Sequence, residues 1–190
     1  SPRTTTRDAL RVDLLVNGTA EGPILETARL RIQPYQPADF DIYVAMWSDP
    51  VVTRFIGGTP FTREQSWTRF LRHAGMWRVL GFGSFAIWDK ATGRHLGEAG
   101  FHDMLRDITP SIEGTMETGW ALLPEAHGKG IASEAVGAVL AWADAHCAGK
   151  RITCFIDTGN PASIRIAEKH GFREYARTDY LGKPVILFER

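Results

Sequence analysis

The sequence has few cysteines, no long apolar run and no excess of charge of either sign. Its two cysteines in 190 residues, Cys147 and Cys154, cannot form the multi-bridge framework of a small secreted protein, and we interpret both as free thiols. No stretch approaches the roughly 18 consecutive apolar residues of a membrane span, and the N-terminus lacks the charged-then-apolar pattern of a signal peptide. These absences predict a cytoplasmic protein that does not bind membranes.

The charges balance, because 22 Lys and Arg oppose 22 Asp and Glu. Zero net charge argues against a general nucleic-acid binder. The composition, 44% apolar and 23% charged, is that of an ordinary globular protein. The length suits one sizeable core better than two. We therefore expect a single domain over residues 24–190, preceded by a polar extension, residues 1–23, whose order depends on docking to that domain.

Apolar periodicity and turn residues predict, in order, a strand, two helices, three antiparallel strands, a helix, a strand, a helix and two strands. The corresponding ranges are Arg29–Tyr35, Asp39–Trp47, Thr62–Leu80, 84–90, 95–104, Glu117–Leu123, Ile131–Cys147, Arg151–Asp157, Asn160–His170, Phe172–Tyr180 and Val185–Glu189. This order predicts a mixed α/β (α+β) fold, with a mostly antiparallel sheet flanked by helices.

A glycine-rich turn, LPEAHGKGIASEA at residues 123–135, separates the third of the antiparallel strands from a long helix. Gly128 and Gly130 leave backbone N–H groups free, and the helix N-terminus adds about half a positive charge. Such a turn suits a diphosphate, although an isolated GxG before a helix is more often only a turn.

Two nucleotide-binding motifs fit the turn poorly. The P-loop fails because Lys129 lies between the glycines and Ile131 follows them. The Rossmann fingerprint GxGxxG/A is a closer match, because Gly128 and Gly130 fit its first two glycines and Ser133 stands at its third small residue. However, the preceding strands form a hairpin, and too few residues follow Asp157 for a doubly wound sheet.

Three segments resemble the GNAT superfamily of N-acetyltransferases, specifically the Rim-type branch of ribosomal-protein N-terminal alanine acetyltransferases. LETARLRIQPYQPADF resembles TERLxLRPxxxxD, ETGWALLPEAHGKGIASEA resembles AEIGYWL followed by PEYxGKGYATEA, and NPASIRIAEKHGF resembles NxxSxxxxEKxGF. The resemblance runs from about Leu25 to the C-terminus. It implies a GNAT fold splayed near Gly128, and transfer of an acetyl group from acetyl-CoA to a primary amine, on a protein N-terminus or a small molecule. We expect direct transfer in a ternary complex, because neither Cys147 nor Cys154 lies at a position that suggests a covalent acetyl carrier.

The resemblance also implies which residues contact acetyl-CoA. They are Leu122, Leu123, His127, Gly128, Lys129, Gly130, Ile131, Ala132, Asn160, Ser163 and Lys169. A backbone N–H near Leu122 and Leu123 is expected to polarise the thioester carbonyl. Lys169 and its neighbour Arg165 either reach the nucleotide phosphates or form a solvated helix face.

The chemistry requires a neutral amine and a protonated leaving thiolate. Lysine amines titrate near pKa ~10.4 and α-amino groups near ~7.7 to 8.0, so lysine needs a base or a desolvated pocket. Glu117 matches the Glu of AEIGY and is our first candidate base, the alternative being an idle strand carboxylate. Glu98 on the neighbouring strand is the second. Ser163 is the implied proton donor to the thiolate, since Ala167 replaces the Tyr of many superfamily members, and its alternative is a local backbone contact.

No metal site is expected. His95 and His102 lie seven apart on one predicted strand, which should place them on opposite faces. The six tryptophans are expected mostly in the core, with those near the two early helices lining an acceptor pocket. The expected partners are acetyl-CoA and an amine, and the expected state is a monomer or a homodimer. A catalytically idle acyl-CoA-binding module and a dinucleotide-binding oxidoreductase are the alternative functions.

Overall fold

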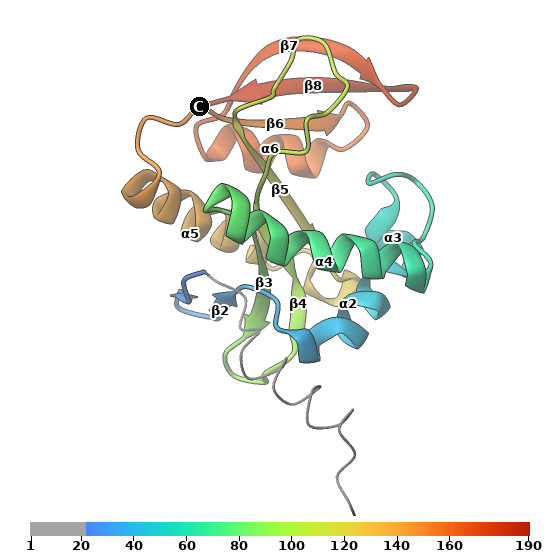
Figure 1. Cartoon of the computed structure of the whole chain (residues 1–190), viewed down its shortest axis with the longest axis vertical. Coiled ribbons are helices and arrows are strands. Elements are labelled where there is room, and N and C mark those ends of the chain that lie inside the picture. The colour runs from blue at the N-terminus through green and yellow to red at the C-terminus, as the bar shows by residue number, and fades with distance from the viewer. Residues whose placement is uncertain (1–21) are drawn as a thin grey trace, which may run out of the picture.

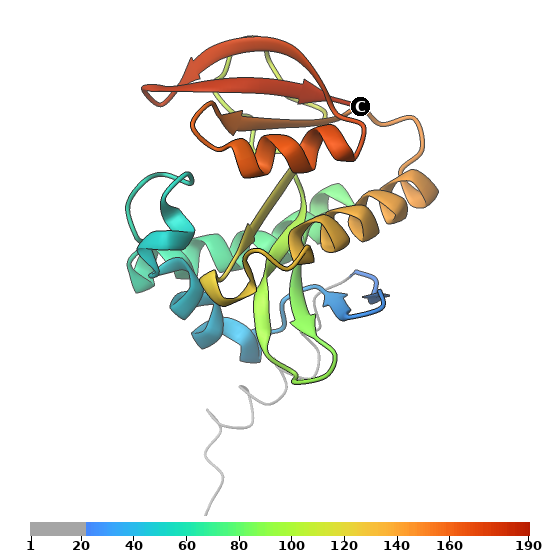
Figure 2. The same ribbon diagram turned by 180° about the vertical axis from the view of Figure 1, so that it is seen from behind.

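The computed structural model describes residues 22–190, in which helices cover both faces of one eight-stranded sheet. α2 and α4 lie on one face and α5 and α6 on the other (Figures 1 and 2). Most of the predicted extension, residues 1–21, is outside the described part of the chain. The elements are β1 Leu25–Glu26, β2 Leu30–Gln33, η1 Pro37–Asp39, α2 Phe40–Trp47, α3 Pro50–Thr53, α4 Arg63–Leu80, β3 Ser84–Asp89, β4 His95–His102, β5 Met116–Leu122, η2 Pro124–Ala126, α5 Ile131–His146, β6 Ile152–Asp157, α6 Pro161–Lys169, β7 Arg173–Tyr180 and β8 Lys183–Glu189.

The sheet has the strand order β1-β2-β3-β4-β5-β6-β8-β7. Every neighbouring pair is antiparallel except β5 and β6, which are parallel. The predicted fold class, a mixed and mostly antiparallel sheet flanked by helices, is therefore confirmed.

The parallel pair is also where the sheet splits. β5 and β6 are in register only at Met116↔Ile152 and Glu117↔Thr153, whereas β5 pairs with β4 along its whole length to Leu122. Beyond Glu117 the two strands diverge, so the sheet opens into two halves joined at one end (Figure 2). This is the splay that the resemblance implied.

Local capping interactions explain where α4 begins and ends and where α6 begins. Thr62 and Gln65 form a reciprocal capping box at the start of α4, and Gly81 ends that helix in a left-handed conformation. At the start of α6 the Asn160 side chain accepts a hydrogen bond from the Ser163 amide, with Pro161 at the first helical position.

Two short elements differ from the prediction. β1 pairs with β2 and was not expected, because two residues are too few for a periodic pattern. The link between the early helices contains α3, where the Asp49 side chain accepts from the Val51 amide and Pro50 begins the helix. Both signals of α3, an acidic N-cap followed by proline, are visible in the sequence.

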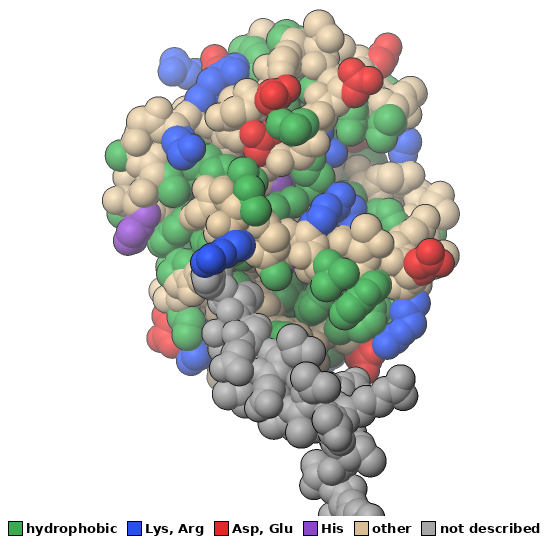
Figure 3. Space-filling view, in the orientation of Figure 1, with side chains coloured by type: hydrophobic (Ala, Val, Ile, Leu, Met, Phe, Trp, Pro, Cys, Tyr) green, Lys and Arg blue, Asp and Glu red, His purple; other side chains and the backbone are tan. Residues whose placement is uncertain are grey.

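One core lies between the sheet and α5, and a second lies between the opposite face and helices α2 and α4. Trp47 and Trp77 are buried as predicted. Trp67, on α4, is 47% exposed. The tryptophans near the early helices are therefore divided between core and surface. The face of the molecule drawn in Figure 3 has both hydrophobic and charged side chains at its surface.

No helix within residues 22–190 is long and apolar enough to cross a membrane. The cytoplasmic location stays a prediction.

Candidate active site

The glycine-rich turn leaves the first amides of α5 without partners. Gly128 and Gly130 have φ angles of 70° and 73°, a region that side-chain-bearing residues rarely adopt. No hydrogen bond of the described chain uses the amides of Lys129, Ile131 or Ala132. These N–H groups and the helix dipole together form a site suited to an anion.

The open edge of β5 begins where its pairing with β6 ends. The Met116 N–H donates to Arg151 O on the β6 side (2.9 Å), and the Leu123 N–H donates to Leu96 O on the β4 side (2.8 Å). Because N–H groups alternate in direction along a strand, the Leu122 N–H points into the split. Because the Leu123 N–H already donates to Leu96 O, the Leu122 N–H is the one that remains available to polarise a thioester carbonyl, which stays a prediction.

Trp120 shares the direction of Leu122, so both offer backbone groups to the split. The carbonyl of Leu122 lies 3.0 Å from His127 Nε2, which donates to it when protonated at that nitrogen. His127, from the glycine-rich turn, therefore ties the turn to the open edge. An extended ligand bound in the split would contact the unpaired edge of β5 at one end and the free backbone amides of the glycine-rich turn at the other.

The start of α6 faces the split from its other side (Figure 2). Asn160 Nδ2 donates to Ser163 Oγ over 3.1 Å, and Asn160 Oδ1 accepts from the Ser163 amide over 3.3 Å. Since Ser163 Oγ accepts from Asn160, its own proton remains available to another acceptor. Asn160 is therefore the N-cap of α6, whereas its predicted contact with acetyl-CoA stays a prediction.

Farther along α6, Arg165 and Lys169 are exposed and Ala167 is fully buried. The Ala167 side chain therefore belongs to the core. His170 Nε2 lies 3.0 Å from Ser133 Oγ, which links the end of α6 to the start of α5.

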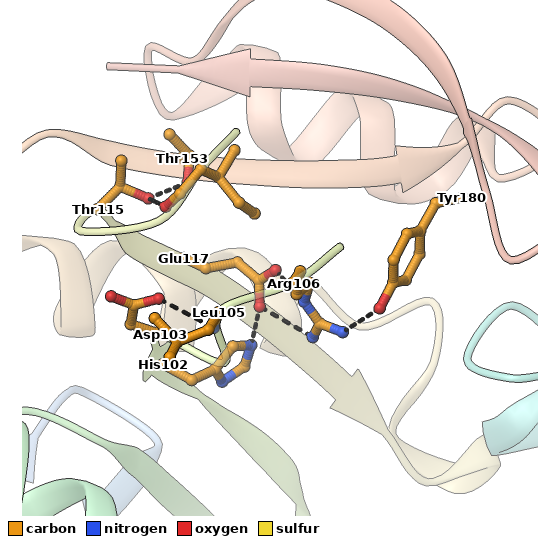
Figure 4. A network of polar contacts seen from close by, with 9 residues as sticks. His102, Asp103, Leu105, Arg106, Thr115, Glu117, Thr153 and Tyr180 are labelled. Atoms are coloured by element: carbon orange, nitrogen blue, oxygen red, sulfur yellow. Dashed lines mark hydrogen bonds and ion pairs between the residues drawn. The ribbon is translucent and has the colours of Figure 1, made fainter. Parts of the chain in front are cut away.

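Glu117 lies at the centre of a buried ionic network (Figure 4). Arg106, from the loop after β4, donates from Nε and Nη2 to the two carboxylate oxygens. His102 Nε2 lies 2.6 Å from Glu117 Oε2. Arg106 also donates to the Tyr180 hydroxyl (3.3 Å) and lies over the ring of Phe155.

These contacts decide the charge of Glu117. Burial acts to raise its pKa, but the charge and hydrogen bond of His102, followed by those of Arg106, outweigh burial and hold the pKa below its usual range. A carboxylate so stabilised is a weak proton acceptor. Glu117, the predicted first candidate base, therefore contacts His102 and Arg106, and its role as a base stays a prediction.

Glu98 is in the opposite situation. It is 7% exposed on β4, and burial raises its pKa to about 7, against a smaller opposing effect of Arg69. Its Oε2 lies 3.5 Å from His73 Nε2 and accepts no hydrogen bond from residues 22–190. The same burial lowers the pKa of His73 to about 3, so this imidazole is neutral. Glu98 is a carboxyl group that titrates near neutrality.

Arg69 of α4 lies above Glu98 and is held by two aromatic rings. Its guanidinium carbon is 4.6 Å from the ring centre of Trp47 and 4.4 Å from that of Phe61. This cation–π arrangement fixes a positive charge beside the buried carboxyl group. The loop that carries Phe61 therefore lies close to the Glu98 site.

A β-bulge corrects the expectation for the two histidines. His95 pairs with Trp88 and Glu98 pairs with Ala86, with a register shift between them. Cross-strand partners share a face, so the extra residue returns His95 to the face of Glu98 and His102. The prediction of opposite faces is wrong, because strict alternation ignores the bulge. His102 lies on the same face as both glutamates, because it pairs with Glu117 and is four residues from Glu98 on the same strand.

Two residues of this site, His102 and Arg106, were not predicted from the sequence. His102 was considered only as a possible metal ligand, and Arg106 lies in a loop with no motif. The available signal for His102 was its closeness to Glu117 across a predicted hairpin.

Across the described residues, no group of three or more His, Cys, Asp or Glu side chains is arranged to hold a metal ion.

Comparison with known proteins identifies the class to which this fold and site belong. A family model described as an acetyltransferase (GNAT) domain matches residues 29–173. The chain therefore belongs to the GNAT acetyltransferase family, whose members use acetyl-CoA. The predicted membership of the GNAT superfamily is confirmed at that level.

Individual relatives agree with the assignment. The chain is 28% identical over 151 residues to the uncharacterized N-acetyltransferase p20 of Bacillus licheniformis, covering 79% of this chain and 82% of the relative. A putative GNAT-family acetyltransferase structure from Bordetella pertussis is 32% identical with a TM-score of 0.81, covering 89% of this chain and 99% of that one. The ribosomal-protein-S5-alanine acetyltransferase of Vibrio fischeri is 18% identical with a TM-score of 0.68, covering 89% and 96%. This last likeness shows the fold and leaves the Rim-type branch a prediction.

Proposed function

We propose that the protein transfers an acetyl group from acetyl-CoA to a primary amine within a ternary complex. The observation that carries the proposal is the unpaired edge of β5, which begins after Glu117 and ends at the glycine-rich turn. A pantetheine arm has the amide groups to pair with such an edge, and the free amides of α5 suit its diphosphate. The predicted contacts at Leu122, His127 and residues 128–132 are retained on this ground.

In this proposal His102 accepts the proton of the attacking amine. The nitrogen forms a bond to the acetyl carbon while the carbon–sulfur bond breaks. Glu117 fixes His102 by accepting from Nε2–H, which leaves the Nδ1 lone pair as the acceptor. His102 and Arg106 together keep Glu117 ionised against the effect of burial. Glu98 is the alternative acceptor, favoured by its pKa of about 7.

The thiolate that leaves requires a proton or an equivalent hydrogen bond. Ser163 has a hydroxyl proton free to donate because Asn160 already donates to its oxygen. The thioester carbonyl is polarised by the Leu122 N–H. His102, Ser163 and the Leu122 N–H would therefore serve the three needs of the reaction, which are an acceptor for the amine proton, a donor to the leaving thiolate and a donor to the thioester carbonyl.

We infer direct transfer because neither cysteine suits an acyl-enzyme. Cys154 is buried in β6 and its thiol pKa is raised by burial, which suppresses the reactive thiolate. Cys147 follows the far end of α5, away from the split.

The function is tested by following free-thiol release from acetyl-CoA with N-terminal peptides, lysine peptides, polyamines and aminoglycosides as acceptors. We expect turnover with at least one amine class, and thermal stabilisation by CoA of about 2.7 kcal/mol at 100 times its dissociation constant. Stabilisation by CoA without turnover of any amine would instead support the idle binding module. Stabilisation by NADH and not by CoA would support the oxidoreductase.

Replacing Ser163 by alanine should lower kcat with acetyl-CoA about 10²-fold, the low end of the range for a proton donor. An aryl thioester of acetate releases a more acidic thiol that needs no proton, so its turnover should fall much less. The comparison is made by thiol release at saturating amine. Equal losses with both donors would contradict the assignment of Ser163.

A further inference from the structure

Two residues of the segment joining β1 and β2 reach across the molecule to the first turn of α5. Thr27 Oγ1 donates to Glu134 Oε2 over 2.6 Å. Arg29 donates to the same carboxylate from its backbone N–H (3.3 Å) and from Nε (3.0 Å). Glu134 therefore accepts three hydrogen bonds from a segment more than 100 residues away.

The Arg29 guanidinium also contacts the glycine-rich turn itself. Nη1 donates to the carbonyl of Lys129 over 2.8 Å. A Cβ built on Gly130 would lie 3.6 Å from Nη2, so this end of the guanidinium borders the backbone of the turn. No hydrogen bond within residues 22–190 uses Nη2, and the side chain is 49% exposed. One donor of Arg29 is thus left open beside the free amides of α5.

The charges of Arg29 and Glu134 matter for the binding of an anion at this turn. Glu134 places a negative charge in the first helical turn, where an incoming diphosphate would be repelled. The ion pair with Arg29 offsets that charge and fixes the guanidinium in place. Lys90 further anchors the segment, because its Nζ donates to Thr27 O over 2.5 Å.

We propose that Arg29 is a diphosphate-binding residue, held in position by Glu134 and Thr27, and that it completes the anion site formed by the amides of α5. The inference rests on the proposed function. Glu134 and Thr27 act through Arg29 and are positioning residues. Arginine suits this role because its fixed fork can donate to Glu134, Lys129 O and a phosphate oxygen at once.

The test compares two acetyl donors with the Arg29→Gln variant. Acetyl-CoA carries the diphosphate, whereas S-acetylpantetheine ends before it. We expect KM for acetyl-CoA to rise about tenfold or more, as for the loss of one charge-assisted hydrogen bond, with kcat within about twofold. KM for S-acetylpantetheine should stay unchanged. Equal shifts for both donors, or no shift for either, would overturn the inference.

Two further variants guard against a purely structural effect. Arg31→Gln is the matched control, since Arg31 lies two residues along and donates to Gln33 and not to the turn, and it should change neither KM. Thr27→Val removes one hydrogen bond to Glu134 and should raise only the KM for acetyl-CoA, by a smaller factor. If wild-type protein neither binds CoA nor releases thiol, the proposed function fails. If wild-type and Arg29→Gln bind CoA equally, only the role of Arg29 fails.

Discussion

Replacing His102 by glutamine is expected to lower kcat about 10²- to 10⁴-fold, the range over which a positioned general base accelerates proton transfer. Glutamine carries its amide nitrogen at the position of His102 Nε2 and can still donate to Glu117, so the buried network keeps its partners. What it lacks is a nitrogen lone pair able to take the amine proton. The measurement is thiol release from saturating acetyl-CoA with the best amine of the panel.

Three comparisons make this result interpretable. His146→Gln changes an exposed histidine of α5 whose Nδ1 contacts only Trp142 O among the described residues, and should leave kcat unchanged. Glu117→Gln should lower kcat by a similar order as His102→Gln, because it removes the charge that stabilises the imidazolium. If His102→Gln keeps wild-type kcat while Glu98→Gln loses it, Glu98 is the base and the role of His102 is wrong.

Replacing Glu98 by glutamine should stabilise the fold at alkaline pH by about 3 kcal/mol and have little effect near pH 4. The folded-state pKa of about 7 exceeds the ordinary value of 4.5, and each pKa unit corresponds to about 1.4 kcal/mol. A raised pKa means that the folded state keeps the proton longer than the unfolded state does. Stability is therefore complete below pH 4.5 and is lost as pH rises toward 7. Urea denaturation of both proteins at pH 4 and pH 8 measures the difference.

Glu117→Gln is the matched control on the same face, and its effect on stability should have the opposite sign. The pKa of Glu117 is lowered, so its charged form stabilises the fold above the ordinary carboxyl pKa, and this is lost on acidification. Removing that charge leaves Arg106 without its buried partner and should destabilise the protein at pH 8. If Glu98→Gln were neutral or destabilising at pH 8, its carboxyl group would not be held at a raised pKa.

The two glutamates illustrate how far the sequence could lead. Both were identified as candidate bases from their strands and from a family motif. Their roles depend on which charges surround them, and those neighbours come from distant parts of the chain. Arg69 beside Glu98 belongs to α4, and Arg106 beside Glu117 belongs to a loop with no motif. The sequence identified the two carboxylates, but the direction in which each pKa is shifted depends on neighbours that only the tertiary structure brings together.

The histidines show a second limit. Alternation along a strand holds only while the register is continuous, and one extra residue before Gly97 reverses the face of His95. Nothing in HLGEAGFH marks that bulge reliably, because its glycines are equally compatible with a regular strand. The assignment of His102 to the site does not depend on the bulge, because His102 pairs directly with Glu117 beyond it.

Patterns of neighbouring residues in the sequence were enough to determine the order of the elements, the glycine-rich turn before α5 and the residues that begin α6. These features are local, since a cap, a turn and an amphipathic period each involve residues a few positions apart. Tertiary structure alone decided which side chains meet in the split sheet. Arg29 reaches Lys129 across 100 residues, and such contacts follow from strand order and packing, which no local pattern encodes.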